Sequence, residues 1–171
     1  PEGFENSLNP QAMADLLTYI STGQPAKTFA GNQPELVRPD ATGALRLLAS
    51  NFEIHGDTLV FEDRYKNLGF WQSDNDCAVW SVEVSKGGAY DVWLDWAVPG
   101  DVPQNSFRLE AGSAAFSAKI PGSGSWDKYR QATLGRIELK AGCQTVVVRG
   151  EQPMKGPIVD LRELRLQPAG K

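Results

Sequence analysis

Residues 80–96 read WSVEVSKGGAYDVWLDW, and this stretch decides the fold class. Apolar residues from Trp80 to Val84 alternate with polar ones, and a second alternating run extends from Tyr90 to Trp96. Alternation with a period of two is typical of strands that bury one face. The Lys86-Gly87-Gly88 turn between the two runs predicts that they form a hairpin.

The same kind of pattern continues toward the C-terminus. Segments 106–110 and 114–119 flank Ala111-Gly112-Ser113 and predict a second hairpin. Residues 128–139 predict a long strand with a bulge near Gly135, and strands at 143–149 and 158–166 follow. Short strands at regular spacing with glycine-rich turns predict an all-β protein, an antiparallel β-sandwich over residues 45–168 with a tail at 169–171.

The N-terminal region has a different pattern. Asn9 can cap a helix, Pro10 suits its first turn, and Gly23 can end it. Met13, Leu16 and Ile20 recur at helical spacing, so a short α-helix with one apolar stripe is expected within residues 1–23. Residues 24–44 are rich in proline and glycine and predict a linker.

Composition limits the classes of partner. The chain has 171 residues, with 17 Lys and Arg against 21 Asp and Glu, for a net charge of −4. This balance disfavours nucleic acid and anionic membrane surfaces as partners. The sequence has no apolar run long enough to insert into a membrane. It begins at Pro1, so we expect a piece of a longer protein.

The residues that nucleophilic catalysis needs are not evident. His55 is the only histidine, and Glu53 would share its side of a short strand and could pair with it. The plainer interpretation is a histidine at a strand end before a glycine turn. Ser123 and Ser125 lack the spacing of a nucleophile elbow. We therefore expect a protein that is not an enzyme.

Two cysteines are expected at opposite ends of the sandwich. Cys77 should open a strand that ends at the 86–88 turn, whereas Cys143 follows a turn of the same kind. Sulfurs so placed cannot meet the geometry of a disulfide. The sequence favours two buried free thiols, and a disulfide between them is the alternative.

The tryptophans separate into core and non-core positions. Trp80 and Trp96 lie on the apolar phase of their strands and are expected in the core. Trp93 shares the outward phase with Asp91 and Asp95. The simplest interpretation of Trp93 is docking against another element, such as the N-terminal apolar stripe.

Other aromatic residues occur in segments that a core does not require. Phe70 and Trp71 follow a glycine, and Trp126 lies in a glycine-serine loop ahead of Asp127 and Tyr129. Flat rings can stack on a pyranose while nearby polar groups bind its hydroxyls, which is one interpretation. The alternative is that Trp71 and Trp126 each close one end of the sandwich. The residues alone leave both open.

The stretch from Leu47 to Pro168 resembles a bacterial sandwich of the galactose-binding-like type. It is similar to carbohydrate-binding modules of families 6 and 35, as appended to fucosidase-like and other multidomain bacterial proteins. The resemblance is carried by an ordered set of segments: 48–56 (LASNFEIHG), 67–71 (NLGFW), 76–80 (DCAVW), 87–92 (GGAYDV), 124–129 (GSWDKY), 139–146 (LKAGCQTV) and 159–166 (VDLRELRL).

The resemblance implies a jelly-roll fold and a sugar site among its loops. The ring positions of that site fall on Phe70 or Trp71 and on Trp126, with Asp127 and Tyr129 beside them. It also implies a structural calcium with Asp160 as a last-strand ligand. Leu48 and Ser50 stand where acids are expected in the first strand, so Glu53 or backbone carbonyls would have to substitute as ligands.

The function implied is a non-catalytic carbohydrate-binding module within a larger exported protein, periplasmic or extracellular. The alternative is a structural sandwich of the same fold that docks a neighbouring domain or a partner without binding sugar. Residues 1–22 resemble the terminal helix of a c-type cytochrome module, so a haem-binding domain is expected to precede the chain. No Cys-x-x-Cys-His is present, so no covalently held haem is expected in the chain itself.

Overall fold

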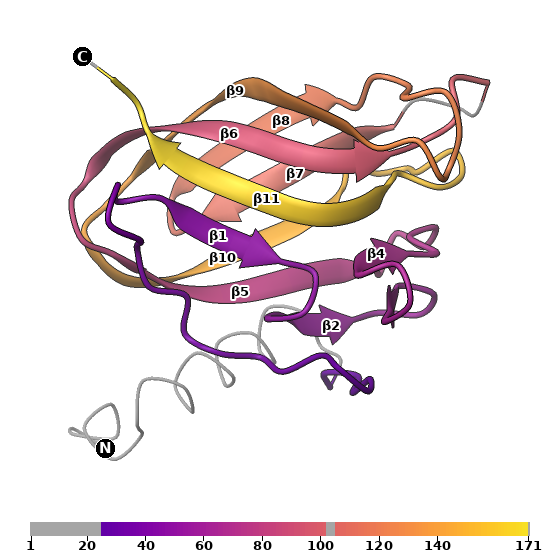
Figure 1. The fold of residues 1–171 in the computed structure, drawn as a ribbon, viewed down its shortest axis with the longest axis horizontal. Coiled ribbons are helices and arrows are strands. Elements are labelled where there is room, and N and C mark those ends of the chain that lie inside the picture. Colours follow the sequence, from indigo (N-terminus) through magenta and orange to yellow (C-terminus); the bar gives the residue numbers. More distant parts are fainter. Residues whose placement is uncertain (1–24, 102–104, 171) are drawn as a thin grey trace.

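The computed structural model describes residues 25–101 and 105–170 as two antiparallel sheets packed face to face (Figure 1). The six-stranded sheet contains β1 (Leu45–Leu48), β3 (Val60–Glu62), β4 (Asn67–Gly69), β6 (Gly88–Ala97), β9 (Arg130–Leu139) and β11 (Asp160–Pro168). The five-stranded sheet contains β2 (Glu53–His55), β5 (Cys77–Val84), β7 (Ser106–Ala111), β8 (Ala114–Lys119) and β10 (Gly142–Gly150).

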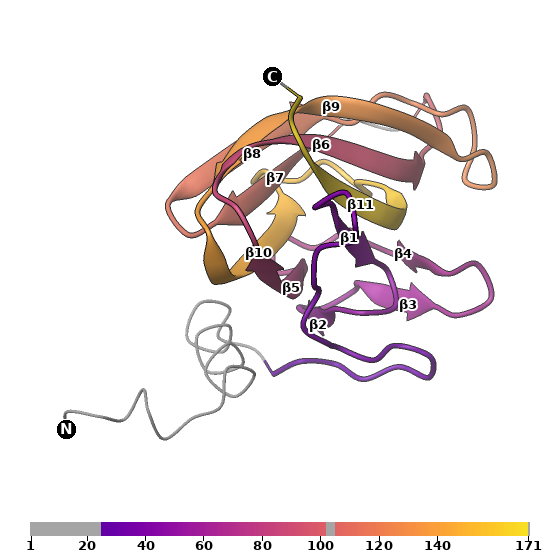
Figure 2. The ribbon, with the colours of Figure 1, turned by 60° about the vertical axis from the view of Figure 1, so that its left-hand side comes forward.

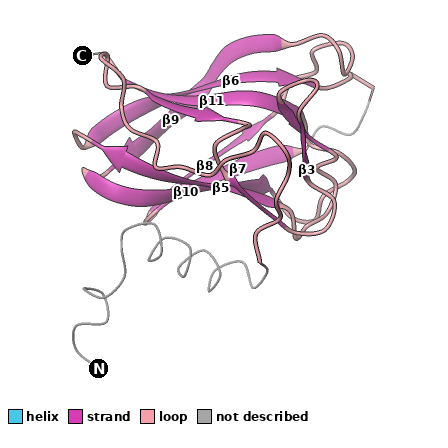
Figure 3. Ribbon diagram, turned by 60° about the horizontal axis from the view of Figure 1, so that its bottom comes forward, coloured by secondary structure: helices cyan, strands magenta, loops and turns pink. Residues whose placement is uncertain are grey.

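Strands are adjacent in the order β3-β4-β11-β6-β9, with β1 also on β11, and in the order β2-β5-β10-β7-β8. The prediction of an all-β antiparallel sandwich is confirmed. The predicted helix within residues 1–23 lies outside the described residues. The described part of the chain is strand and loop only (Figure 3), and it holds no helix long and apolar enough to cross a membrane.

The predicted hairpin over residues 80–96 is wrong. β5 pairs with β2 and β10 in one sheet, whereas β6 pairs with β9 and β11 in the other. The 86–88 turn therefore carries the chain from one sheet to the other. Because a strand buries one face in either arrangement, alternation and a glycine turn cannot distinguish a hairpin from a crossing between layers.

The second predicted hairpin is confirmed, because β7 pairs with β8 from Ser106↔Lys119 to Ala111↔Ala114. The bulge is also confirmed. Val92 pairs with Gly135 and Trp93 with Thr133, so one residue of β9 is left over beside Gly135.

The core lies between the two sheets and holds the tryptophans expected there. Trp80 and Trp96 are both fully buried. The Trp80 ring lies 4.9 Å from that of Phe52, measured between centroids. Trp93, on the outer face of β6, is half-buried, and the Arg165 guanidinium lies over its ring at 4.4 Å. A contact of Trp93 with the N-terminal stripe lies outside the described residues.

The segment expected as a linker packs along the five-stranded sheet. Lys27 forms an antiparallel bridge with Ile54, and Val37 forms a parallel bridge with Val82. Val37 is buried. Figure 2 shows this indigo segment passing β2 before it turns into β1. Residues 25–44 thus border the five-stranded sheet, with one bridge to β2 and one to β5.

The loop that follows β4 is fixed by one buried carboxylate. Asp76 accepts hydrogen bonds from the Thr58 amide at 2.8 Å and hydroxyl at 2.5 Å, and from the amides of Gln72 at 3.2 Å and Ser73 at 2.9 Å. Burial alone would raise the pKa of Asp76, but these hydrogen bonds together hold it below its ordinary value. The carboxylate ties the turn after β2 to the segment after β4.

The two cysteines lie at opposite ends of the β5–β10 ladder, as expected, and both are free thiols. Cys77 is buried, and burial raises the pKa of its thiol to about 11. Cys143 is exposed, which corrects the prediction of two buried thiols. Cys143 is the second residue of β10, immediately after the turn, where neighbouring residues leave its side chain open to solvent.

The exposure difference predicts selective thiol labelling. At pH 8, DTNB should label one thiol per native chain, because the Cys77 thiolate is scarce and covered. Cys143→Ser should remove almost all labelling of the native chain, and Cys77→Ser should leave it unchanged. Equal labelling of both cysteines in the folded chain would contradict this assignment.

Removing the charge of Asp76 should destabilise the fold. Asp76→Asn places an amide donor among backbone and hydroxyl donors, so we expect a loss of about 1–3 kcal/mol in the free energy of unfolding at pH 7. A carboxyl whose pKa is lowered by folding stabilises above its unfolded pKa, and this contribution is lost as pH falls through the folded pKa.

The variant should therefore lose less stability than the natural chain on acidification below about pH 4, near the ordinary aspartate pKa. Denaturant titrations at pH 7 and pH 3 measure both effects. Asp101→Asn, at an exposed position with no side-chain interaction among the described residues, is the matched control. Equal losses in the two variants at pH 7 would refute the role given to Asp76.

Candidate functional site

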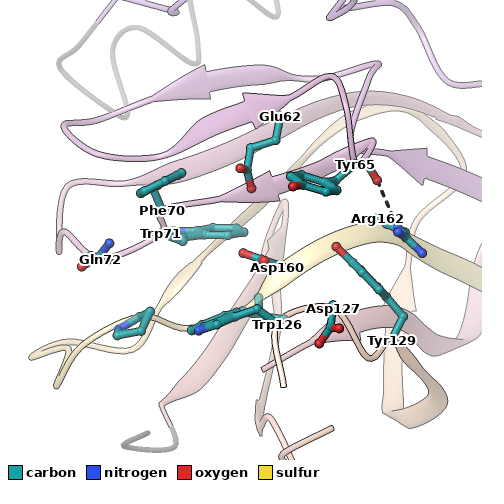
Figure 4. Close-up of a pocket in the computed structure, with 12 residues that line it drawn as sticks. Glu62, Tyr65, Phe70, Trp71, Gln72, Trp126, Asp127, Tyr129, Asp160 and Arg162 are labelled. Atoms are coloured by element: carbon teal, nitrogen blue, oxygen red, sulfur yellow. Dashed lines mark hydrogen bonds between the residues drawn. The ribbon is translucent and has the colours of Figure 1, made fainter. Parts of the chain in front are cut away.

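A pocket of about 470 Å³ lies where β4 ends and β9 and β11 begin. Its walls come from three parts of the chain that are distant in sequence: residues 62–72, residues 126–129 and residues 157–162. Figure 4 shows aromatic side chains from these segments, with the carboxylates of Glu62 and Asp160, around one hollow. All five predicted sugar-site residues line it, namely Phe70, Trp71, Trp126, Asp127 and Tyr129.

The exposure of the rings differs sharply. Phe70 is 57% exposed and Trp126 is 38% exposed, whereas Trp71 is only 1% exposed. Phe70 and Trp126 therefore present ring faces to solvent from separate segments, and Trp71 lies between them in the view of Figure 4. Of the two alternatives for the first ring, Phe70 is the exposed wall and Trp71 the buried one.

Local backbone geometry explains why adjacent rings point in opposite directions. The indole of Trp71 donates a hydrogen bond to the Asp76 carbonyl at 3.2 Å, and the Trp71 carbonyl accepts one from the Ile158 amide at 3.0 Å. Phe70 has a φ of 57°, in the left-handed region that few side chains other than glycine adopt. Trp71 is thus anchored inward, and the turn at Phe70 places its ring outside.

The glycine-serine loop that carries Trp126 is held by hydrogen bonds. The Ser123 amide donates to the Val98 carbonyl at 2.8 Å, and the Ser123 hydroxyl accepts from the Val98 amide at 2.9 Å. The Ser125 hydroxyl donates to Asp127 at 2.5 Å, which lowers the pKa of that carboxyl. Hydrogen bonds therefore hold this glycine-serine loop on both sides of Trp126.

Charged groups complete the pocket, and the sequence indicated Asp127 and Asp160 but not Glu62 or Arg162. Glu62 comes from the end of β3, and its carboxylate accepts a hydrogen bond from the buried Asn67 amide at 2.9 Å. Asp160 opens β11. Burial, with a further contribution from the negative charge of Glu62, raises the pKa of Asp160 to about 7.

Arg162 lies two residues after Asp160 on β11. Its guanidinium carbon lies 3.4 Å from the centroid of the Tyr129 ring, and its Nε donates to the Tyr65 carbonyl at 3.2 Å (Figure 4). Burial raises the pKa of Tyr129 to about 12. Tyr65, 49% exposed, is the third aromatic residue open to solvent at this pocket.

Sequence reasoning missed Glu62, Tyr65 and Arg162. Residues two apart on a strand share a face, so Arg162 could have been placed beside Asp160. Glu62 and Tyr65 gave no such signal, because the strand pairing that brings them to β11 is not local: Leu68 of β4 pairs with Leu161.

The proposed calcium ligands are not brought into one ligand group. Glu53 lies on β2 in the five-stranded sheet, and Asp160 lies on β11 in the other. Among residues 25–101 and 105–170, no group of three or more His, Cys, Asp or Glu side chains is arranged to hold a metal ion. A site that uses backbone carbonyls beside Asp160 is not tested by this finding, so the structural calcium stays a prediction.

His55 and Glu53 are buried neighbours on β2, with 3.2 Å between Nε2 and Oε2. They share one side of the strand as their spacing predicts, and His55 ends the strand before Gly56. Neither residue lines the pocket. The pair packs within the sandwich and does not contribute to the candidate site.

The sequence matches no protein-family model and no curated protein. Solved structures do resemble the chain. A family 35 carbohydrate-binding module from Cellvibrio japonicus is 13% identical, with a TM-score of 0.61 over 74% of this chain and 94% of that one. A family 35 module from Clostridium thermocellum is 15% identical, with a TM-score of 0.61 over 74% and 98% of the two chains.

A third similar structure, the Xyl-CBM35 module in complex with a disaccharide that contains glucuronic acid, is 12% identical. Its TM-score is 0.56 over 74% of this chain and 99% of that one. At such identities the likeness concerns the fold. The chain therefore has the galactose-binding-like sandwich fold of family 35 carbohydrate-binding modules, as the resemblance in its sequence implied.

Proposed function

We propose that this chain is a non-catalytic carbohydrate-binding module that binds a saccharide in the pocket between Phe70 and Trp126. The observation that carries the proposal is the pair of exposed rings, which come from two separate loops and border one pocket. An exposed apolar ring has no role in the core, and flat aromatic faces suit the apolar face of a pyranose.

Polar groups lie where sugar hydroxyls would need partners. Gln72, Asp127 and Asp160 line the same pocket as the two rings. Carboxylates and amides between stacking faces would fix the orientation of the ring, because hydroxyls both donate and accept hydrogen bonds. The fold supports the same proposal, since the similar solved structures include modules described as carbohydrate-binding.

The setting we propose is a larger exported protein, periplasmic or extracellular, in which this module holds a glycan close to a neighbouring domain. Among the similar structures is a Podospora anserina mannanase described as GH26-CBM35, of which this chain covers 28%. We also propose that another domain of this larger protein precedes the module.

The alternative of a docking sandwich has less support. Its best candidate surface was Trp93, and the Arg165 guanidinium already lies over that ring. The exposed rings instead gather around the pocket, where a groove rather than a flat face is available. These observations favour a small ligand over a flat protein surface.

A glycan array on the chain, repeated with single variants, tests the proposal. Phe70→Ala and Trp126→Ala should each weaken binding of any positive glycan by about tenfold or more, since a lost stacking surface of about 1.4 kcal/mol corresponds to that factor. Both rings are exposed, so neither truncation leaves a cavity in the core.

Trp93→Ala is the control, because it removes an indole from the outer face of β6 and leaves the pocket intact. Isothermal titration with the best glycan gives the affinities. Uniformly blank arrays with the folded chain, or equal losses in Trp93→Ala and Trp126→Ala, would overturn the assignment of this site.

A further inference from the structure

The pocket carries more negative than positive charge. Three carboxylates line it, those of Glu62, Asp127 and Asp160, against the single guanidinium of Arg162. Within the described part of the chain, Arg162 forms no ion pair with any of them. Its guanidinium lies on the Tyr129 ring and donates to the Tyr65 carbonyl. The positive charge therefore does not neutralise the acids that face the hollow.

Asp160 is available to a ligand. Its side chain makes no hydrogen bond or ion pair to any residue that the structure describes. Glu62, by contrast, is held by the Asn67 amide, and Asp127 by the Ser125 hydroxyl. A half-buried carboxyl without a protein partner, facing a pocket between exposed rings, is a group that a ligand can satisfy.

Two of the carboxylates influence each other. The negative charge of Glu62 opposes ionisation of Asp160, and burial acts in the same direction. A ligand with a positive group between them would relieve this repulsion, whereas a ligand with a carboxylate would add a further negative charge to it. A neutral sugar would neither relieve nor increase the repulsion between the two carboxylates.

We propose that the pocket selects saccharides by charge, with Glu62 and Asp160 favouring a sugar that carries an ammonium group and rejecting a uronic acid. This inference rests on the proposed saccharide binding and names its ligand class. The rings supply stacking that is common to all pyranoses, and the two carboxylates discriminate among them by the substituent.

The charge preference changes with pH in a defined direction. The titratable and charged groups around Asp160 are Glu62 from β3, Tyr65 from the turn after it, Asp127 and Tyr129 from the loop before β9, and Arg162 from β11. Asp160 is largely protonated below about pH 7 and ionised above it. The affinity for a uronate, relative to its neutral counterpart, should therefore fall as pH rises through 7.

The test uses two matched sugar series: D-glucose, D-glucosamine and D-glucuronate, and D-galactose, D-galactosamine and D-galacturonate. Saturation-transfer NMR and titration of tryptophan fluorescence give the affinities at pH 7.5, where Asp160 is mostly ionised and a large fraction of each amine still carries a proton. The uronate comparison is repeated from pH 5.5 to 8.5. We expect the amino sugar to bind most tightly and the uronate about tenfold more weakly than the neutral sugar at pH 8.5, because like charges in a pocket repel.

Asp160→Asn and Glu62→Gln should each narrow the difference between uronate and neutral sugar, and Asp160→Asn should also abolish its change between pH 6 and pH 8. Glu138→Gln is the matched control, because it removes one exposed negative charge near the opposite end of β9 from the pocket. Trp126→Ala should weaken all three classes of sugar together.

The outcomes separate the two proposals. Binding that depends on Trp126 but is equal for uronate and neutral sugar overturns the charge selection and leaves the saccharide site. Tighter binding of the uronate, or a gain for the uronate on adding calcium, also overturns it, because the acids would then act as metal ligands. No binding of any of these sugars, together with blank arrays, ends the proposed function itself.

Discussion

The candidate site depends on the buried carboxylate of Asp76. Its oxygens accept from Thr58 on one side and from the amides of Gln72 and Ser73 on the other. The Asp76 carbonyl also receives the Trp71 indole, so this residue fixes both the backbone and the buried ring of the same loop. Phe70 comes immediately before this fixed point and is turned outward by its left-handed φ. An interior interaction thus determines where an exposed ring stands.

The fold class could be predicted from sequence because alternation directly reports which face of a strand is buried. The partners of each strand could not, as the crossing from β5 to β6 demonstrates. A turn such as 86–88 closes a hairpin or crosses between layers with the same residues, and the choice depends on β10 and β11 far along the chain. The β7–β8 hairpin was predictable because its two strands do pair with each other.

Part of the site was predictable from sequence, because aromatic residues in loop segments are not required by a core. A core does not require an indole in a glycine-serine loop, which singled out Trp126 from sequence as a candidate ring, although closing one end of the sandwich stayed an alternative. Which of Phe70 and Trp71 faces solvent depended on the φ of Phe70 and on Asp76, and neither is evident in a local pattern. Glu62 reaches the pocket through a strand pairing between β4 and β11, which sequence spacing does not reveal.

The position of Arg162 explains why the pocket keeps its negative charge. Asp160 and Arg162 are two residues apart on one strand, a spacing at which opposite charges on the same face can pair. The guanidinium instead lies 3.4 Å from the centroid of Tyr129 and hydrogen bonds the Tyr65 carbonyl. Cation–π contact and that hydrogen bond hold the guanidinium in place without using a carboxylate. Asp160 is thereby left unneutralised beside Glu62, which is an unfavourable arrangement that a bound positive group would relieve.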